Sequence, residues 1–590
     1  MTSEEITELL DVMRPQISNI SDSSLHVTVT ALFNLVEFMF RENKKYKDEI
    51  QNLKNEINRL KGEQGKPDIK SNNKEKGKNI SSEQERHKRD KNKSRKPKSK
   101  KAHLEIHDTK KCTVDKSELP LDAVFKGYSD VIVQDIKIEA VNIRFQREIY
   151  YSSSKKKTYS GKLPDGWNGD FSPGVKALIL SLYHDLKLTM PSIVSFFNTH
   201  GVLISESTIS NILTKESYEM FCKEKLEIVN AGLNSSDFQH TDDTGSSVNG
   251  INYYTHILCN DLYTAYFTEE KKDRLTVLKI LSGGELFYSL NDTAYLIMKN
   301  LNLSDKWIIK LQKSNVEGSV SYKQLDSLLL SIFPDKRKNP NVQKRIVEAC
   351  AIAGYRSRMN SVKVLICDDA PQFKEITEEL GLCWIHEGRH YKKLSPVYSW
   401  HRELLDSFIS DFWDFYADLK IYKNNPSNTA KECMYKKFDS LFTQKTYYDS
   451  LDERIAKTYN KRKELLLVLE KPYIPLHNNP AEGEVRVEKR KQDISFQTRT
   501  KEGTVMKDAG MTIVQTAKKL GVNCYKYFYD RISGALKMMS LADIILLNTH
   551  RRLLIRYFFL IATFLINLIC SSVPVSLRAS HEDKPLLFFC

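Results

Sequence analysis

Residues 476–491 read LHNNPAEGEVRVEKRK and predict the start of a helix. Asn479 suits the N-cap position, Pro480 suits the first turn, and Glu482 then falls at the third helical position. Cations follow on the same helical face, four, seven and eight residues after Glu482: Arg486, Lys489 and Arg490. Two interpretations are open. Glu482 could close a capping box on the amide of the cap residue, or it could bind a metal ion beside a cationic stripe that faces a polyphosphate backbone.

Carboxylates also end two predicted strands upstream of this helix. Residues 362–369 read VKVLICDD, and such a continuous apolar run suits a central strand that is buried on both faces. Asp368 would lie at its C-terminal tip, where ligands of open sheets gather. Residues 238–245 read FQHTDDTG and predict a short strand that ends at Asp242. The Asn-Gly pair at 249–250 then predicts a tight hairpin into 253–259, with a third strand at 263–267. Each aspartate is either a turn residue or a metal ligand.

Several local stretches resemble the transposases of the insertion-sequence-66 family. They are DDTG at 242–245 with VNG at 248–250, VLICD at 364–368, CWIH at 383–386, NNPAE at 478–482, and the RK pair at 490–491. The NNPAE and CWxH elements are the most specific of these. The resemblance covers the chain from around residue 20 to around residue 545.

The resemblance implies a DDE transposase with a ribonuclease-H-like α/β catalytic core. Its acidic triad would be Asp242, Asp368 and Glu482, which would hold two Mg²⁺ ions, with Mn²⁺ able to substitute. The implied reaction is DNA strand cleavage and strand transfer of an insertion sequence, in which metal ions activate the attacking oxygen and stabilise the leaving one. Adjacent strand residues face opposite sides, so only one aspartate is expected to bind metal in each of the pairs 242–243 and 368–369. The implied catalytic domain spans 235–535.

Within this domain, the cationic face of the Glu482 helix is expected to contact the DNA backbone. Its contacts would be Arg486, Lys489, Arg490 and Lys491. Glu484 and Glu488 lie on other faces and are expected to be structural. Segments at about 283–360 and 395–470 are predicted insertions, the second of them a packed helical one.

The chain departs from the family pattern in its cysteines. Family members commonly carry a cysteine-rich zinc module before the DNA-binding helices, and only Cys112 stands in that region, so zinc is not expected. Cys383, His386 and His390 have a spacing that could serve zinc, but packing is the preferred interpretation. Position 243 is Asp where the family usually has Glu. The apolar tail at 550–590 lies outside the resemblance and is expected to be outside the functional fold.

A heptad pattern dominates residues 20–62 and predicts a coiled-coil dimerisation helix. Glu42, Glu49 and Glu56 occupy g positions and Lys47, Lys54 and Lys61 occupy e positions, so a parallel dimer would pair opposite charges. A buried pair of Asn43 side chains would fix the register. The other seam residues singled out for dimerisation are Leu32, Val36, Ile50, Leu53, Ile57 and Leu60.

Three modules are predicted between this helix and the catalytic domain. Residues 63–111 form a basic linker that cannot fold alone, either a solvated spacer or a segment that binds DNA phosphates. Residues 112–170 form a small β-rich module with strands at 130–138 and 141–151. Residues 171–216 predict a helix-turn-helix-like region, with helices from about 173 to 186, from Thr189 to Gly201, and from a Ser205 cap onward. Its groove-facing candidates are Ser207, Thr208, Ser210 and Asn211.

Composition agrees with a nucleic-acid partner. The net charge is +15, and 41% hydrophobic with 28% charged residues suits a folded multidomain α/β protein. The ten cysteines include no CxxC pair, which favours a reducing compartment. The resemblance implies that this compartment is the bacterial cytoplasm, at the nucleoid. The expected partners are transposon-end and target DNA, a second copy of the chain and, in some elements, accessory proteins, with no membrane partner. The alternative is a DNA-binding protein without catalysis, a decayed or regulatory copy of a transposase.

Overall fold

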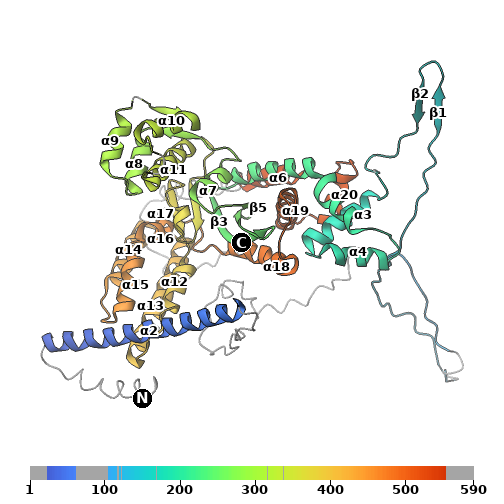
Figure 1. Cartoon of the computed structure of the whole chain (residues 1–590). Helices are drawn as coiled ribbons and strands as arrows, with labels where there is room; N and C mark the ends of the chain where they lie inside the picture. The colour runs from blue at the N-terminus through green and yellow to red at the C-terminus, as the bar shows by residue number, and fades with distance from the viewer. Residues whose placement is uncertain are drawn as a thin grey trace, which may run out of the picture. The chain divides into compact units, whose positions relative to one another are not determined.

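The computed structural model describes residues 23–60, 104–115, 119–120, 123–167, 169–314, 316–335, 338–552 and 554 (Figure 1). The chain divides into two units, one made of residues 70–146 and 195–204 and the other of the remaining chain. Most of the predicted 63–111 linker, the side chain of Leu60 and nearly all of the 550–590 tail lie outside the described residues.

A five-stranded mixed sheet forms the centre of the larger unit. Its strand order is β5 (Thr264–Glu269), β4 (Ile251–Cys259), β3 (Phe238–Val248), β8 (Val364–Cys367) and β9 (Glu379–Leu382). Strands β3, β4 and β5 are antiparallel neighbours, whereas β8 and β9 run parallel to β3. Asn249 and Gly250 have φ of 49° and 78° at the β3–β4 turn, which confirms the predicted tight hairpin.

The first strand differs from its prediction. Strand β3 does not end at Asp242 but continues to Val248. Its parallel ladder with β8 stops at the pair His240 and Ile366, whereas its antiparallel ladder with β4 continues through Asp242, opposite Ile257, to the hairpin. The hairpin therefore carries the strand beyond the point where the parallel sheet ends.

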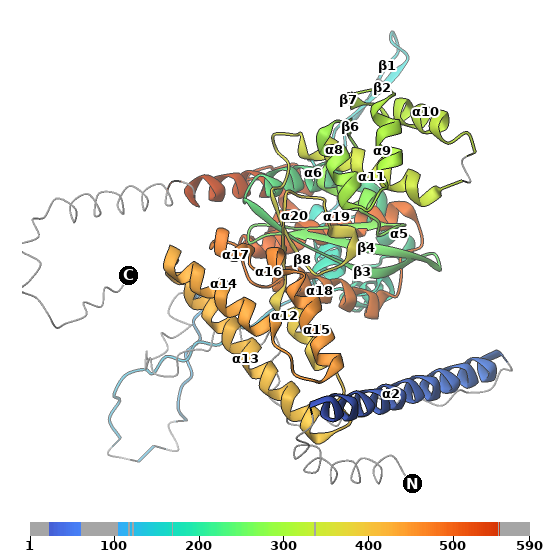
Figure 2. The ribbon, with the colours of Figure 1, turned by 90° about the vertical axis from the view of Figure 1, so that its left-hand side faces the viewer.

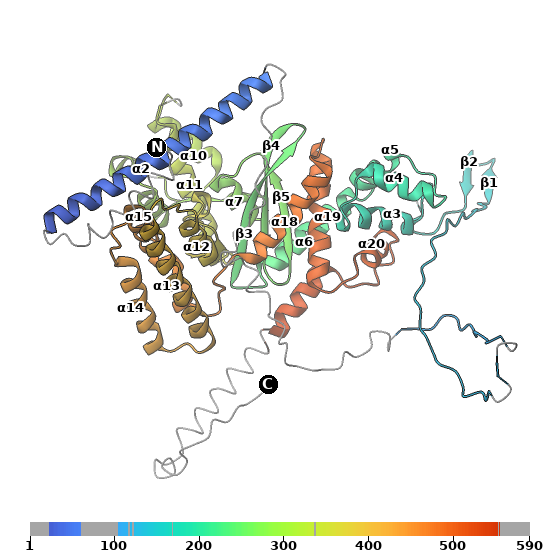
Figure 3. The ribbon, with the colours of Figure 1, turned by 90° about the horizontal axis from the view of Figure 1, so that it is seen from below.

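Helix α19 (Lys501–Lys519) covers the free edge of β5 (Figure 3). Three backbone N–H groups of β5 donate to one helical face: Thr264 to Thr516 Oγ1 (3.2 Å), Tyr266 to Thr512 Oγ1 (3.1 Å) and Thr268 to Asp508 Oδ2 (2.6 Å). Four strand residues span about 14 Å and eight helical residues about 12 Å, so the two periods match. The backbone N–H groups at the edge of the sheet thereby donate to side chains of α19 rather than to another strand.

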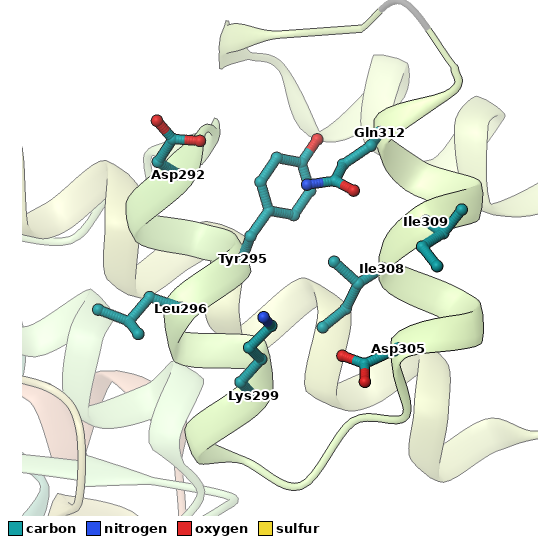
Figure 4. Close-up of a pocket in the computed structure, with 8 residues that line it drawn as sticks. All are labelled: Asp292, Tyr295, Leu296, Lys299, Asp305, Ile308, Ile309 and Gln312. Carbon is teal, nitrogen blue, oxygen red and sulfur yellow. The ribbon is translucent and has the colours of Figure 1, made fainter.

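The first insertion begins after α7 (Arg274–Leu281) and packs on α11 (Pro340–Arg356). It contains β6 (Tyr288–Leu290), α8 (Asp292–Asn300), α9 (Asp305–Gln312), β7 (Gly318–Val320) and α10 (Tyr322–Ile332). A side chain at Gly354 would meet the backbone of Phe287 at 2.3 Å, so α11 and the segment entering β6 can approach this closely only with glycine there. Helices α8 and α9 border an open cavity of about 530 Å³, into which Tyr295 and Ile308 project (Figure 4).

The second insertion is helical, as predicted. It follows α12 (Trp384–Lys392) and contains α13 (Ser399–Asn424), α14 (Asn428–Thr443), α15 (Asp449–Tyr459), α16 (Arg462–Leu465) and α17 (Leu467–Glu470). Helices α13 and α14 lie side by side (Figure 2). Trp384 stands at the centre of its aromatic core, with ring centroids of Phe412 and Phe415 each 5.5 Å away. The apolar stripe of 395–470 is therefore packing surface.

The N-terminal heptad segment forms one helix, α2 (Ser23–Leu60), that contacts the second insertion through a face other than its seam. Glu37 is fully buried, where its carboxylate accepts from the Val397 amide (2.8 Å) and pairs with His401 Nδ1 (2.5 Å). The ring of Phe33 packs edge-on against Tyr398 and Trp400. Along the heptad seam, Leu32, Ile50, Leu53 and Ile57 are between 49% and 57% exposed and Asn43 is also exposed, whereas Val36 is half-buried.

Self-association through this seam stays a prediction. We expect Ile50→Pro with Ile57→Pro to give a monomer in light scattering, because proline breaks the helix that carries the seam. Ile50→Asp with Ile57→Asp should also give a monomer, because it places charges in the seam while the helix stays intact. The control is Gln51→Asp with Asn52→Asp, at exposed positions off the seam, which should leave the mass unchanged. An unaltered mass in both seam variants would rule out the coiled coil.

The predicted β-rich module is largely wrong in its secondary structure. Among the described residues of 104–170, the strands are β1 (Ile149–Ser152) and β2 (Lys157–Ser160), which form one hairpin. The expected strand at 130–138 does not form. Its apolar positions Val131, Val133 and Ile136 are 80–82% exposed, so the alternating pattern has no second apolar surface to pack against.

The helices of the predicted helix-turn-helix region are present. They are α3 (Pro173–Leu180), continued by the π-turn η3 (Ser181–Asp185), α4 (Met190–Thr199) and α5 (Glu206–Asn211), continued by η4 (Ile212–Glu216). Ser205 accepts from the Thr208 amide at 3.2 Å and Thr189 from the Ser192 amide at 3.3 Å, which confirms both predicted caps. Helix α4 lies partly in each unit, since the boundary falls between Val194 and Ser195.

Within the described part of the chain, every helix is too short or too polar to traverse a lipid bilayer.

Candidate active site

Two of the predicted ligands lie at the end of the parallel pair of strands. His240 of β3 pairs with Ile366 of β8, and Asp242 and Asp368 each follow two residues later. The two aspartates therefore lie at the same level of neighbouring strands, Asp242 within β3 and Asp368 directly after β8. Burial, followed by the charge of Asp368, raises the pKa of Asp242 to about 7. Burial also raises the pKa of Asp368.

The neighbouring aspartates have different environments. Asp369 pairs with Lys461 at 2.7 Å and with Lys374 at 3.0 Å. Burial alone would raise the pKa of Asp369, but these two ammonium groups outweigh it and lower the pKa. Asp243 accepts from Gln372 Nε2 at 2.6 Å. Among the described residues, no lysine or arginine lies within ion-pair distance of Asp242 or Asp368, so their charge is left for another cation.

Glu482 lies on α18 (Asn479–Ser495), which begins one residue earlier than predicted. Asn478 is the cap residue and Glu482 is the fourth helical residue, so Asn479 does not cap. The Asn478 side chain is fully buried and makes no cap hydrogen bond. It instead contacts His240 Nδ1 at 2.9 Å and donates to the Thr241 carbonyl at 2.8 Å. The start of α18 is thereby attached to β3 directly beside Asp242.

The carboxylate of Glu482 does not form a capping box. Arg389 Nη2 donates to its Oε2 at 3.0 Å, and Arg486 lies at 3.6 Å from the same oxygen. Its other oxygen, Oε1, is buried and has no hydrogen-bond partner, with His386 Nδ1 3.5 Å away. Arg389 was not among the predicted site residues, because its contact with Glu482 spans 93 positions of the chain.

A second donor set lies beside the carboxylates. Ligand atoms of Cys383, His386 and Glu482 lie within 4.8 Å of one another. Glu482 thus takes the third place in this cluster, where the spacing of the sequence suggested His390. Burial raises the pKa of the Cys383 thiol to about 12, and its sulfur accepts from the Asn478 amide at 3.2 Å. A protonated, hydrogen-bonded thiol is a poor ligand, which favours packing for Cys383.

Comparison with known proteins assigns part of the chain to a family. Residues 344–506 match the family model described as "Transposase IS66 family". This segment is an IS66-family transposase domain. It contains Asp368, Arg389 and Glu482, whereas Asp242 lies before it. An uncharacterized protein of Sinorhizobium fredii (strain NBRC 101917 / NGR234), y4jO, is 28% identical over 310 residues, which cover 52% of this chain and 94% of the relative.

The family implies DNA binding and a ribonuclease-H-like core. The mixed sheet, with its antiparallel β3–β5 meander and the two parallel strands, is the α/β architecture expected of that core.

The cationic face of α18 in the transposase domain is exposed at three of four predicted positions. Arg486, Lys489 and Arg490 are exposed, and Lys489 Nζ donates to the Gly245 carbonyl at 2.8 Å. Lys491 is 2% exposed, so the prediction that it contacts DNA is wrong. Its ammonium group lies 3.5 Å from the Tyr183 ring centroid, and burial lowers its pKa to about 7. The reason is helical phase, because nine residues after Glu482 is half a turn away.

The two acidic residues expected to be structural are confirmed as such. Glu488 is fully buried and pairs with Lys507 at 2.7 Å, and Glu484 accepts from the Tyr266 hydroxyl at 2.7 Å. Of the candidates on α5, Ser207 and Asn211 are exposed, while Thr208 and Ser210 are half-buried. Their contact with a DNA groove stays a prediction.

Proposed function

We propose that this chain is a DDE transposase, with Asp242, Asp368 and Glu482 as its metal-binding carboxylates. The observation that carries the proposal is the pair of unpaired, partly buried aspartates at one level of adjacent strands, with the start of the Glu482 helix attached beside them through Asn478. Perturbed carboxylates without a protein counterion are typical of catalytic sites.

The residues fit divalent cations. The donor set is carboxylate oxygen, which Mg²⁺ prefers. One oxygen of Glu482 is buried without a hydrogen-bond donor, and the charge of Asp368 helps to raise the pKa of Asp242. Two bound cations would activate the attacking hydroxyl or water and stabilise the leaving oxygen of the phosphodiester.

Arg389 balances the charge of Glu482 while no cation is present. A cation held by Glu482 would neutralise that charge, and the guanidinium group of Arg389 would then be able to bind phosphate oxygens in a bidentate fashion. Arg486, Lys489 and Arg490 extend this positive surface along α18. Binding of these groups to DNA should weaken as salt rises, through the loss of counterion release.

The role of Arg389 predicts a change in cation affinity. We expect Arg389→Ala to enlarge the rise in melting temperature that Mg²⁺ produces, because the cation no longer competes with Arg389 for Glu482. DNA cleavage should fall in the same variant. The measurement is thermal unfolding over a Mg²⁺ titration. Arg402→Ala, at an exposed arginine of α13, is the control and should match the wild type. A smaller Mg²⁺ effect in Arg389→Ala would contradict this role.

The test of the function is an assay of the purified chain with labelled DNA. The substrate is a duplex from the ends of the element that encodes the protein, in Mg²⁺. We expect strand cleavage at the end and joining of the free 3′-hydroxyl to target DNA. Salt-sensitive binding without metal-dependent cleavage, also in the presence of the element's accessory proteins, would instead support the non-catalytic alternative.

A further inference from the structure

The C-terminal end of α18 carries a strained and exposed aromatic residue. Phe496 follows the last helical residue with φ 57° and ψ −66°, and its side chain is 79% exposed. The amide of Gln497 donates to the Ser495 carbonyl at 2.7 Å. This geometry is the three-residue γ-turn with positive φ, which is rare and strained for any residue with a side chain. Glycine would adopt this conformation without steric strain, so the side chain of Phe496 is held against its conformational preference.

Several contacts hold the turn in place. Gln497 Oε1 accepts from the Gly250 amide at 2.6 Å and from Ser247 Oγ at 3.1 Å. The Asn249 amide donates to the Thr498 carbonyl at 2.8 Å, next to an isolated bridge between Val248 and Thr498. The turn is therefore fixed to the tip of the β3–β4 hairpin, whose first strand carries Asp242. Strain of this kind persists only where the surrounding structure imposes it, and it concentrates at functional positions.

The exposure of the ring argues against a packing role. A phenylalanine that stabilised the turn through burial would have most of its surface covered, as Phe373 and Phe438 do at 1% and 0% exposed. The ring of Phe496 is instead exposed at the end of a helix whose outer face carries three exposed cations, Arg486, Lys489 and Arg490, and one exposed acid, Asp493. A partner that matches both features has a negative backbone and flat apolar rings. DNA bases supply such rings, and aromatic side chains bind them by stacking or by wedging between base steps.

The length of α18 sets where the contact would fall. Phe496 lies fourteen residues after Glu482, which corresponds to about 21 Å along a helix. Successive nucleotides of one strand are about 3.4 Å apart, so this span is about six nucleotides. We propose that Phe496 stacks on a DNA base about six nucleotides from the phosphate that reacts at Asp242, Asp368 and Glu482. The inference rests on the proposed function, since it requires DNA to lie along α18.

The experiment uses the full chain and a nicked duplex with a free 3′-hydroxyl at the nick. Each duplex carries one 2-aminopurine, a fluorescent adenine analogue that reports stacking, at a different distance from the nick. The buffer contains no divalent cation, so the DNA is not cut. We expect a fluorescence change that is largest about six nucleotides from the nick, and about tenfold weaker binding by Phe496→Ala.

Three variants separate stacking from folding. Phe496→Gly removes the ring together with the strain, so its melting temperature should not fall while its fluorescence change is lost. Phe496→Trp should retain the fluorescence change, because it keeps a stacking surface. The control is Tyr447→Ala, since Tyr447 also combines positive φ (61°) with an exposed ring (64%) but lies between α14 and α15. It should leave the fluorescence change intact.

The outcomes distinguish this inference from the proposed function. If Phe496→Ala keeps the fluorescence change, or if the wild type shows none at any position while it still binds and cuts DNA, the stacking role is refuted and the transposase assignment stands. If the wild type does not bind DNA, both fail. A protein partner lost on Phe496→Ala, with the DNA signal unchanged, would also overturn the stacking role.

Discussion

Asp242→Asn, Asp368→Asn and Glu482→Gln should each lower Mg²⁺-dependent cleavage and strand transfer by at least about a thousandfold while DNA affinity stays near that of the wild type. Each substitution is close to isosteric and removes one anionic oxygen from the donor set. DNA binding should persist, because the exposed cations of α18 remain in place. The losses should not add in double variants, since the three carboxylates act as one unit.

The adjacent aspartates provide a matched control. Asp369 is neutralised by Lys461 and Lys374, and Asp243 is hydrogen-bonded to Gln372. Asp243→Asn and Asp369→Asn should therefore lower activity far less than the changes at 242 and 368. The measurements are gel assays of cleavage and fluorescence anisotropy of DNA binding. Equal cleavage by the wild type and all three triad variants would refute the site. A loss at 369 as large as that at 368 would reassign the ligand.

The parts of the fold that the sequence predicted well are those with a strong local pattern. The apolar run before Asp368, the Asn249–Gly250 turn and the caps at Thr189 and Ser205 all have the structure expected of them. In each case a period or a side-chain hydrogen bond within a few residues decides the conformation. The strand at 130–138 failed for the converse reason, because alternation forms a strand only where another surface covers it.

The errors at the site have tertiary causes. The sequence offers two asparagines before Pro480, and local capping rules favoured Asn479. The structure uses Asn478 as the cap residue, but its side chain binds β3, a contact that spans 237 positions of the chain. Arg389 acts on Glu482 across 93 positions, which no local pattern reveals. Lys491 is different, since the helical period alone places it opposite Glu482.

Docking of α2 was likewise hidden from the sequence. The heptad period identifies the seam, but the buried pair of Glu37 and His401 joins a different face of the helix to α13. A polar residue outside the seam has no periodic signal of its own. Helix α2 thus combines two features. Its contact with α13 corresponds to no sequence motif, whereas its exposed seam follows the heptad pattern.

Asp242→Asn should raise the stability of the cation-free protein at pH 8 and leave it almost unchanged at pH 4. The pKa of Asp242 is about 7 in the folded chain, against an ordinary value of 3.8. Between these values the unfolded chain has lost a proton that the folded chain retains, so stability falls as pH rises from about 4 to about 7 and then levels off. The difference corresponds to on the order of 4 kcal/mol, which asparagine removes because it does not ionise.

The measurement is urea unfolding in EDTA from pH 4 to pH 8. Asp243→Asn, one residue along β3, serves as the control and should lack this pH-dependent gain. Lower stability of Asp242→Asn at pH 8, or a gain that does not depend on pH, would contradict the prediction.

Mg²⁺ should reverse this order of stability, because only the wild type retains the full donor set. Cation binding requires the ionised form of Asp242, so the apparent Mg²⁺ affinity of the wild type should fall about tenfold for each pH step below 7. Burial and the charge of Asp368 destabilise the ionised carboxylate of Asp242 in the cation-free protein. A bound divalent cation would offset both effects. If Asp242 served only as a turn residue, Mg²⁺ would not reverse the order of stability of the wild type and Asp242→Asn, and the effect of Mg²⁺ on stability would not depend on pH in this way.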